Sequence, residues 1–240
     1  MNSTTPRHHR SGQAGFTIVE IAIVLLVVGL MIGGLIAPLS SQLEQRRVAD
    51  TQRAMEEARE ALFGFALRNN YLPCPAISAI DGREDRAGSI CNKRYGYLPW
   101  ATLGVQRLDG WGRILAYSVT PAFANSVSFF TLGSPRDITV ATRGLDGQII
   151  PASDANDIPA VIVSFGRNGY GATSDQNTRL LDAGIGNIDE KTNLGGEGVA
   201  FVSRPASTDP RAPGGEYDDL VLWMSPNILF NRMVAAQKLP

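Results

Sequence analysis

The sequence predicts an α+β fold in which one long N-terminal helix packs on an antiparallel β-sheet domain and a short helix ends the chain. Three features of the 240 residues predict it. Residues 16–38 are almost entirely apolar, residues 39–70 place apolar side chains at helical spacing among charges, and residues 71–240 contain short β-like runs between turns. Helical periodicity and short strands in separate parts of a chain are typical of an α+β protein.

The first feature is the apolar run from Phe16 to Ala37, in which Glu20 is the single charged residue. As a helix, its 22 residues extend about 33 Å, which is enough to cross the hydrocarbon core of a bilayer. A carboxylate in such a segment raises the free energy of membrane insertion by about 2.5–3.5 kcal/mol. Either a signal anchor tolerates Glu20 near its edge, or Glu20 has a dedicated cationic partner.

Residues 1–15 have the composition of a leader peptide. They are short and polar, contain Arg7 and Arg10, and lack any acidic residue. A secretory signal is cut after its apolar stretch, at a site with small residues. Here that end reads Leu35-Ile36-Ala37-Pro38, which is a poor site, whereas the small-residue boundary Ala14-Gly15 precedes the apolar run.

The hexapeptide Gly15-Phe16-Thr17-Ile18-Val19-Glu20 resembles the prepilin cleavage and methylation motif of type IV pilins and type II secretion pseudopilins. The resemblance implies that prepilin peptidase, a membrane-embedded aspartyl protease, cuts between Gly15 and Phe16, and that the new amine of Phe16 is methylated. It also implies that Glu20 pairs with the terminal amine of a neighbouring subunit.

The same resemblance implies a location and a set of partners. The protein is expected in the bacterial inner membrane as a single-pass protein with its globular domain in the periplasm, and later in a filament. The expected partners are prepilin peptidase, other pilin or pseudopilin subunits, the inner-membrane assembly platform and, before assembly, membrane lipid.

Residues 39–70 are expected to form the amphipathic half of the same helix. There is no proline from Ser40 to Asn69. Together with the apolar half this predicts one helix of about 80 Å, interrupted near Gly33-Gly34 and Pro38. The charges on the other faces are either solvated or paired between subunits. The predicted buried stripe alternates steps of three and four residues: Val48, Thr51, Met55, Ala58, Leu62 and Phe65.

The rest of the chain predicts a sheet with long loops. Asp146-Gly147 is a plausible tight hairpin turn, residues 166–171 are read as a turn, and residues 171–198 as a surface loop. Ser225-Pro226 is a good helix start, and the terminal helix should run to about Gln237. Strands are expected at residues 114–119, 128–132, 138–142, 148–150, 160–165, 199–203 and 219–224.

Cys74 and Cys91 are the two cysteines of the chain. In an oxidising periplasm we expect them to form a disulfide, worth about 3 kcal/mol from loop entropy. The alternative is two unpaired buried thiols. Zinc is not expected, because two thiolates leave the usual set of four ligands half empty.

Composition argues against catalysis and against a nucleic-acid surface. The net charge is −1, and removal of the two leader arginines makes it −3, without the basic excess of nucleic-acid-binding domains. Both histidines, His8 and His9, lie in the leader. The processed chain therefore lacks the commonest general base, and no enzyme activity, cofactor or metal is predicted.

Two further segments resemble pseudopilin globular domains. Asp109-Gly110-Trp111-Gly112-Arg113, followed by Tyr117, is similar to the Asp-x-Trp-Gly segment that leads into their first β-strand, and residues 218–223 are similar to a final strand. The alternative is that the aromatic residues simply fill a core. Some pseudopilins bind calcium; four acids could supply oxygens here but match no strong motif: Asp209, Glu216, Asp218 and Asp219.

The sequence thus favours a structural subunit, with the size and loops of a minor one. Two alternatives stay open. One is a periplasmic binding or enzymatic domain on an uncleaved signal anchor. The other is an adhesive or DNA-uptake minor pilin whose loops bind a ligand. The sequence does not distinguish a subunit of a type IV pilus from a subunit of a type II secretion pseudopilus.

Overall fold

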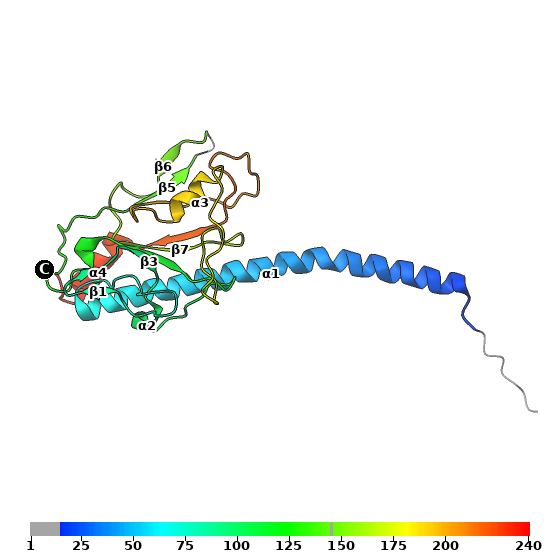
Figure 1. Cartoon of the computed structure of the whole chain (residues 1–240), viewed down its shortest axis with the longest axis horizontal. Coiled ribbons are helices and arrows are strands. Elements are labelled where there is room, and N and C mark those ends of the chain that lie inside the picture. The colour runs from blue at the N-terminus through cyan, green and yellow to red at the C-terminus, as the bar shows by residue number, and fades with distance from the viewer. Residues whose placement is uncertain (1–14, 145) are drawn as a thin grey trace, which may run out of the picture. The chain divides into compact units, whose positions relative to one another are not determined.

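The computed structural model describes residues 15–144 and 146–240, without the side chains of residues 33–39. Of the predicted leader, only Gly15 therefore lies within the described residues. The chain divides into two compact units, Met1–Gln45 and Arg46–Pro240. Helix α1, Ile18–Asn69, begins in the first unit and ends in the second (Figure 1).

In the first unit, α1 exposes its large apolar side chains as far as Ile32. The interruption expected near Gly33-Gly34 and Pro38 is not present as a gap, since α1 continues through these positions. Side-chain effects at these residues lie outside what the structure describes. Over the described residues, no helix combines the length and the apolar character needed to cross a membrane.

In the second unit, the main sheet is antiparallel, as predicted, and has the strand order β3-β4-β7-β9. Its strands are β3 (Tyr95–Tyr97), β4 (Ala116–Val119), β7 (Ala160–Ser164) and β9 (Leu220–Trp223). The central strands β4 and β7 are buried along their whole length, while the edge strands β3 and β9 are half-buried. The middle of the sheet therefore carries the core, and the edge strands are only partly covered; at the β3 edge, the Tyr97 carbonyl oxygen accepts the backbone N–H of Ala76.

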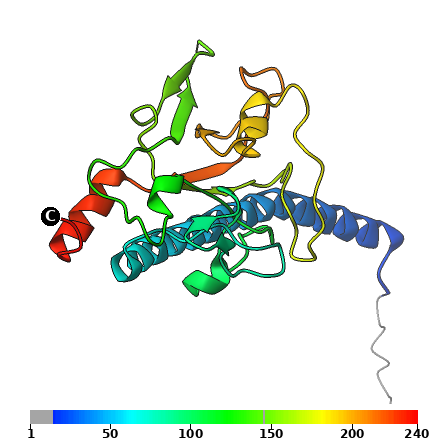
Figure 2. The ribbon, with the colours of Figure 1, turned by 60° about the vertical axis from the view of Figure 1, so that its left-hand side comes forward.

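A second, three-stranded sheet has the order β6-β5-β8, from β5 (Thr139–Arg143), β6 (Ile149–Pro151) and β8 (Ala200–Val202). Figures 1 and 2 show the β5–β6 hairpin and helix α3 (Ile188–Asn193) on the side of the main sheet opposite α1. Here β5 and β8 are parallel, so the expectation of a purely antiparallel domain is wrong for this pair. Residues 144–199 supply a connection long enough for parallel pairing.

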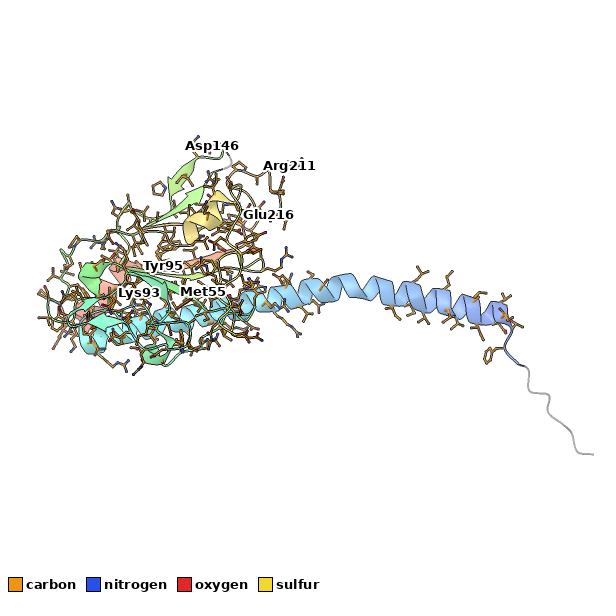
Figure 3. All side chains as sticks on the ribbon, viewed as in Figure 1. Met55, Lys93, Tyr95, Asp146, Arg211 and Glu216 are labelled. Carbon is orange, nitrogen blue, oxygen red and sulfur yellow. A yellow bond between two sulfur atoms is a disulfide. The ribbon has the colours of Figure 1, made fainter. Side chains whose placement is uncertain are left out.

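The half of α1 that lies in the second unit packs on the main sheet because of its apolar stripe. Met55 and Leu62 are buried against Tyr117, Ile162 and the C-terminal helix. Figure 3 shows Met55 where α1 meets the sheet. Burial of each such side chain stabilises the fold by about 1.5–3 kcal/mol. The predicted stripe is confirmed, except that Val48 is half-buried; the buried surface also takes in Ala54, Phe63 and Ala66.

The other elements match the sequence-based expectations in part. Strands β5, β6, β7, β8 and β9 lie where the runs predicted them, but residues 114–115 precede β4 rather than belong to it. Residues 128–132 form no strand; there Phe130 packs on Phe123 instead. The tight turn at Gly147 is present, with φ of 80°. Elements not predicted are β1 (Arg86–Ala87), β2 (Ile90–Cys91), β3, α2 (Trp100–Leu103), a 3-10 turn (Pro121–Phe123) and α3.

The last helix, α4, runs from Pro226 to Ala235, close to the expected bounds. Pro226 occupies the first turn, where its missing N–H costs nothing. Ser225 precedes the helix, but its side chain makes no capping hydrogen bond. A bidentate ion pair between Arg232 and Glu60 joins α4 to α1.

Candidate functional site

The predicted processing site lies just before helix α1. Gly15 and Phe16 lie outside any helix or strand and are exposed, with Phe16 83% accessible. A Cβ placed on Gly15 would meet no atom within 4 Å. The peptide bond between these residues is therefore reachable from solvent in the described chain.

Thr17 and Glu20 close the first turn of α1 as a reciprocal pair. The Glu20 carboxylate accepts the backbone N–H of Thr17 at 2.8 Å, and the Thr17 hydroxyl oxygen accepts the N–H of Glu20 at 3.3 Å. The hydroxyl also donates to the same carboxylate, at 2.9 Å. This is the capping box Thr-x-x-Glu, which satisfies two otherwise unpaired backbone donors. The sequence-based predictions do not include Thr17, although the Thr-x-x-Glu spacing that identifies a capping box is visible in the sequence.

Large apolar side chains cover all faces of α1 from Ile18 to Ile32. Ile18 is 88% exposed and Leu30 70%. A helix that is apolar on every face is normally covered by protein or lipid. In this segment Glu20 is the single charge.

In the second unit, the Asp109-Gly110-Trp111-Gly112 segment forms a tight loop against α1. Gly110 donates its N–H to the Thr51 hydroxyl at 2.9 Å. A Cβ on Gly110 would lie 2.3 Å from the carbonyl oxygen of Arg47, so only glycine fits this approach. The loop ties the strand that follows it to the helix, and its role in the structure is packing.

Asp109 organises the same loop from the inside. Its Oδ1 accepts the backbone N–H groups of Trp111 and Arg113, both at 2.9 Å, and its Oδ2 accepts the Ser164 hydroxyl at 2.6 Å. Burial raises the pKa of the Asp109 carboxyl, against the opposing effect of these hydrogen bonds. Ser164 belongs to β7, so Asp109 links the loop to the centre of the sheet.

Cys74 and Cys91 form the expected disulfide. The enclosed segment is held further by Glu84, whose carboxylate accepts the N–H of Cys74 at 3.1 Å and pairs with Arg86 at 2.9 Å. Arg86 in turn donates to the carbonyl oxygen of Ala124. The disulfide thus closes the loop after α1, and Arg86 ties this loop to the rest of the domain.

Three carboxylates meet beside the start of β9. One oxygen each from Glu190, Asp218 and Asp219 lies within 4.8 Å of the others. Burial raises the pKa of Glu190, and it raises that of Asp219 well above the ordinary value. Amide donors serve the cluster: Asn168 binds Glu190 at 2.7 Å, and Asn193 binds Asp219 at 2.9 Å.

The structure brings together only part of the acidic set considered for calcium. Asp218 and Asp219 are in the cluster, whereas Asp209 and Glu216 are not; Glu190 completes it instead. Carboxylate oxygens suit Ca²⁺, but Glu190 and Asp219 already accept hydrogen bonds from asparagine amides. Glu190 and Asn193 come from a segment predicted to be a loop, and no local pattern indicates that they approach β9.

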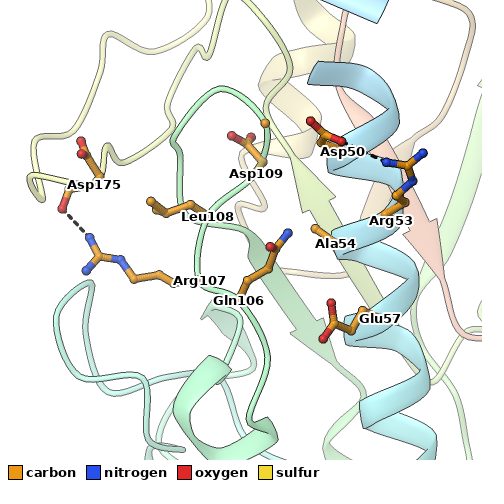
Figure 4. A pocket seen from close by; sticks show the side chains of 10 residues that line it. Asp50, Arg53, Ala54, Glu57, Gln106, Arg107, Leu108, Asp109 and Asp175 are labelled. Atoms are coloured by element: carbon orange, nitrogen blue, oxygen red, sulfur yellow. Dashed lines mark hydrogen bonds and ion pairs between the residues drawn. The ribbon is translucent and has the colours of Figure 1, made fainter. Parts of the chain in front are cut away.

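A cleft of about 640 Å³ lies between one face of α1 and residues 106–110 (Figure 4). In Figure 4, Arg53 pairs with Asp50 across one turn of the helix, and Arg107 points to Asp175. Four carboxylates and two guanidinium groups line the cleft. It can hold a cationic or mixed-charge group, and neither histidine nor cysteine, the usual side chains for general-base or thiol chemistry, is in its lining.

No family model, no curated protein and no solved structure matches the chain.

Proposed function

We propose that this chain is a pilin-like structural subunit. In this proposal prepilin peptidase cuts after Gly15, the amine of Phe16 is methylated, and the mature chain assembles into a type IV pilus or a type II secretion pseudopilus as a minor subunit. The observation that carries the proposal is the apolar segment that begins at Phe16, directly after Gly15, with exposed side chains as far as Ile32 and Glu20 as its single charge.

The assembly step follows from the need to cover that helix. In the membrane, lipid covers residues 16–38; in the filament, the same surface packs against the helices of other subunits. Glu20 then neutralises the Phe16 amine of a neighbouring subunit. A carboxylate offers about four acceptor positions, so Glu20 can keep its bonds from Thr17 while it binds that amine.

The proposed location is the bacterial inner membrane, with the domain in the periplasm, and then the filament. The disulfide between Cys74 and Cys91 supports an oxidising compartment. The partners are prepilin peptidase, other pilin or pseudopilin subunits and the inner-membrane assembly platform. The proposal includes no cofactor, and the fold of the domain serves assembly rather than catalysis.

Glu20→Ala tests the proposal in cells that assemble the filament. The variant should be exported and folded like the wild type, because the side-chain hydrogen bonds of Glu20 within the described residues go to its near neighbour Thr17 and not to the globular domain. Its incorporation into filaments should fall, because the neighbouring amine loses its counter-charge. If the variant enters filaments as well as the wild type, the pairing of Glu20 with a terminus is wrong.

A further inference from the structure

We propose that a pocket beside Trp223, in the globular domain, binds the pyranose ring of a sugar. The pocket has a volume of about 610 Å³ and is lined by most of residues 151–158, by Trp223 and by residues 225–227. We call it the Trp223 pocket. Its volume is in the range of about 300–1,000 Å³ that is typical of small-ligand sites. The inference goes beyond the proposed function and does not depend on the cut after Gly15.

Trp223 supplies an aromatic wall. It is the last residue of β9, where it lies opposite Val161 of β7, and it is half-buried. Part of its side chain packs on the core cluster that includes Val140 and Val161, and it also lines the pocket. The next residue, Met224, donates its N–H to the carbonyl oxygen of Ala160 at 2.9 Å. The end of the strand that carries the indole is therefore fixed.

A second wall of the pocket is the loop at residues 152–157, and hydrogen bonds hold its shape. Asn156 has a φ of 53°, in the left-handed region that asparagine tolerates. It donates its N–H to the Thr139 hydroxyl at 2.8 Å and accepts that hydroxyl at 3.2 Å. Asp157 accepts the Nε–H of Arg136 at 2.6 Å. The loop is thus shaped by its own domain before a ligand binds.

Three polar side chains of the lining make no hydrogen bond within the part of the chain that the structure describes: Asp154, Ser225 and Asn227. Asp154 and Asn227 are exposed, and Ser225 precedes α4 without capping it. Together they offer a carboxylate that accepts and a hydroxyl and an amide that both donate and accept. The pocket therefore has hydrogen-bonding groups that the fold does not use.

This combination favours a sugar over other small ligands. A pyranose ring has a face of C–H groups that packs on an aromatic ring, and a rim of hydroxyls that each donate and accept. An apolar ligand would leave the polar side chains without partners, and an anion would be repelled by the Asp154 carboxylate. A cation would suit Trp223 and Asp154 but would leave the donors of Ser225 and Asn227 without acceptors.

Solution NMR of the full-length protein, in a detergent without a sugar headgroup, tests the proposal. The probes are methyl β-D-glucopyranoside, methyl α-D-mannopyranoside and methyl N-acetyl-β-D-glucosaminide, with choline as the cationic comparison. The readout is the indole N–H signal of each ¹⁵N-labelled tryptophan, with that of Trp223 assigned through Trp223→Phe. We expect at least one glycoside to shift the Trp223 signal in a saturable way and to leave those of Trp100 and Trp111 unchanged. Choline should shift none of them.

Two pairs of variants test the lining, with affinity measured by saturation transfer to the sugar protons. Asp154→Ala should lower the affinity for the bound glycoside roughly tenfold, because a hydrogen bond to a charged group is lost. Asp175→Ala is the matched control, since it removes an exposed carboxylate at the cleft of Figure 4 and should leave the affinity unchanged. Trp223→Leu should abolish saturable binding, whereas Trp223→Phe should retain it because an aromatic face remains.

Four results would each overturn the proposal: no saturable shift with any glycoside, equal shifts of all the indole signals, a response to choline alone, or equal effects of Asp154→Ala and Asp175→Ala. Asp154 is exposed, so its variant remains informative even if Trp223→Leu fails to fold. Glycoside binding by a chain that keeps its leader would contradict the proposed function and leave the sugar site intact. The two proposals therefore fail separately.

Discussion

The carboxylate of Glu20 accepts both the backbone N–H and the hydroxyl of Thr17, at 2.8 and 2.9 Å. The same side chain therefore caps its own helix and, in the proposed filament, neutralises a neighbour's terminus. A loss of assembly in a Glu20 variant could arise from either role. The two roles differ in what they require, since capping needs an acceptor and pairing needs a negative charge.

Glu20→Gln separates these roles. Glutamine also completes a capping box, so the first turn of α1 should remain intact while the charge is lost. We expect Glu20→Gln to enter filaments as poorly as Glu20→Ala, and Thr17→Ala to enter nearly as well as the wild type. The measurement is the ratio of assembled to membrane-bound subunit by quantitative immunoblotting. The opposite ranking would assign the role of Glu20 to capping.

The contact of Gly110 with α1 predicts a stability difference between two glycines. Gly110→Ala should lower the free energy of unfolding by roughly 1–3 kcal/mol, because its Cβ would collide with the carbonyl oxygen of Arg47. Gly64→Ala is the control: its Cβ meets nothing within 4 Å, and alanine in a helix gains about 0.5–1 kcal/mol. Denaturant unfolding followed by tryptophan fluorescence measures both. Equal effects would contradict the packing described for the loop.

Local patterns predicted much of the fold. The stripe that includes Met55 and Leu62 was readable because helical periodicity and burial coincide on one face of α1. Strand β7 was readable because its β-branched run is buried on both faces. Residues 128–132 have the same propensity but no neighbouring strand, since the core there is filled by Phe130 against Phe123. Strand pairing depends on neighbours, which composition does not reveal.

The parts that could not be predicted depend on contacts between distant segments. Asp189 is fully buried between Arg143 and Arg204, which come from the ends of β5 and β8. Glu190 reaches Asp218 from a segment that reads as a polar loop. Of the candidate site residues, Cys74 and Cys91 could be paired because two cysteines in an oxidising compartment leave one combination. The role of Thr17 could have been predicted, because the Thr-x-x-Glu spacing of a capping box lies within one stretch of the sequence.

The disulfide should stabilise the domain. Reduction of the wild-type protein, or the double substitution Cys74→Ala and Cys91→Ala, should lower the free energy of unfolding by about 3 kcal/mol. The double variant is also the control for the reductant, which should leave its denaturation midpoint unchanged. A wild-type midpoint that does not respond to dithiothreitol would show that the bond contributes nothing to stability.

Asp219 should make the domain less stable as the pH rises. Burial, reinforced by Glu190 and Asp218, raises the pKa of Asp219 well above its ordinary value of 3.8. A carboxyl with a raised folded-state pKa gives stability that is fully present below the unfolded value and is lost as the pH rises through the folded value. Asp219→Asn keeps an acceptor for the Asn193 amide. This variant should match the wild type near pH 4 and exceed it in stability at neutral pH.

Asp81 provides the control of opposite sign. Hydrogen bonds from Arg83 lower the pKa of Asp81 to about 2. The contribution of Asp81 to folding stability is therefore present above pH 3.8 and is lost as the pH falls through about 2. In the Asp81→Asn variant, the free energy of unfolding should therefore still fall as the pH rises from about 4 to neutral, as it does in the wild type. Parallel pH profiles for wild type and Asp219→Asn, measured by thermal unfolding, would contradict the assignment of that trend to Asp219.

The start of the mature chain tests the central proposal most directly. Full-length protein extracted from membranes of the producing cell can be analysed by intact mass and by N-terminal sequencing, which report the cut and the methyl group together. The proposal predicts a chain that starts at Phe16 with one added methyl group on its amine. A retained Met1, or a start beyond Ala37, would contradict it, because Glu20 would then have no liberated terminus to bind.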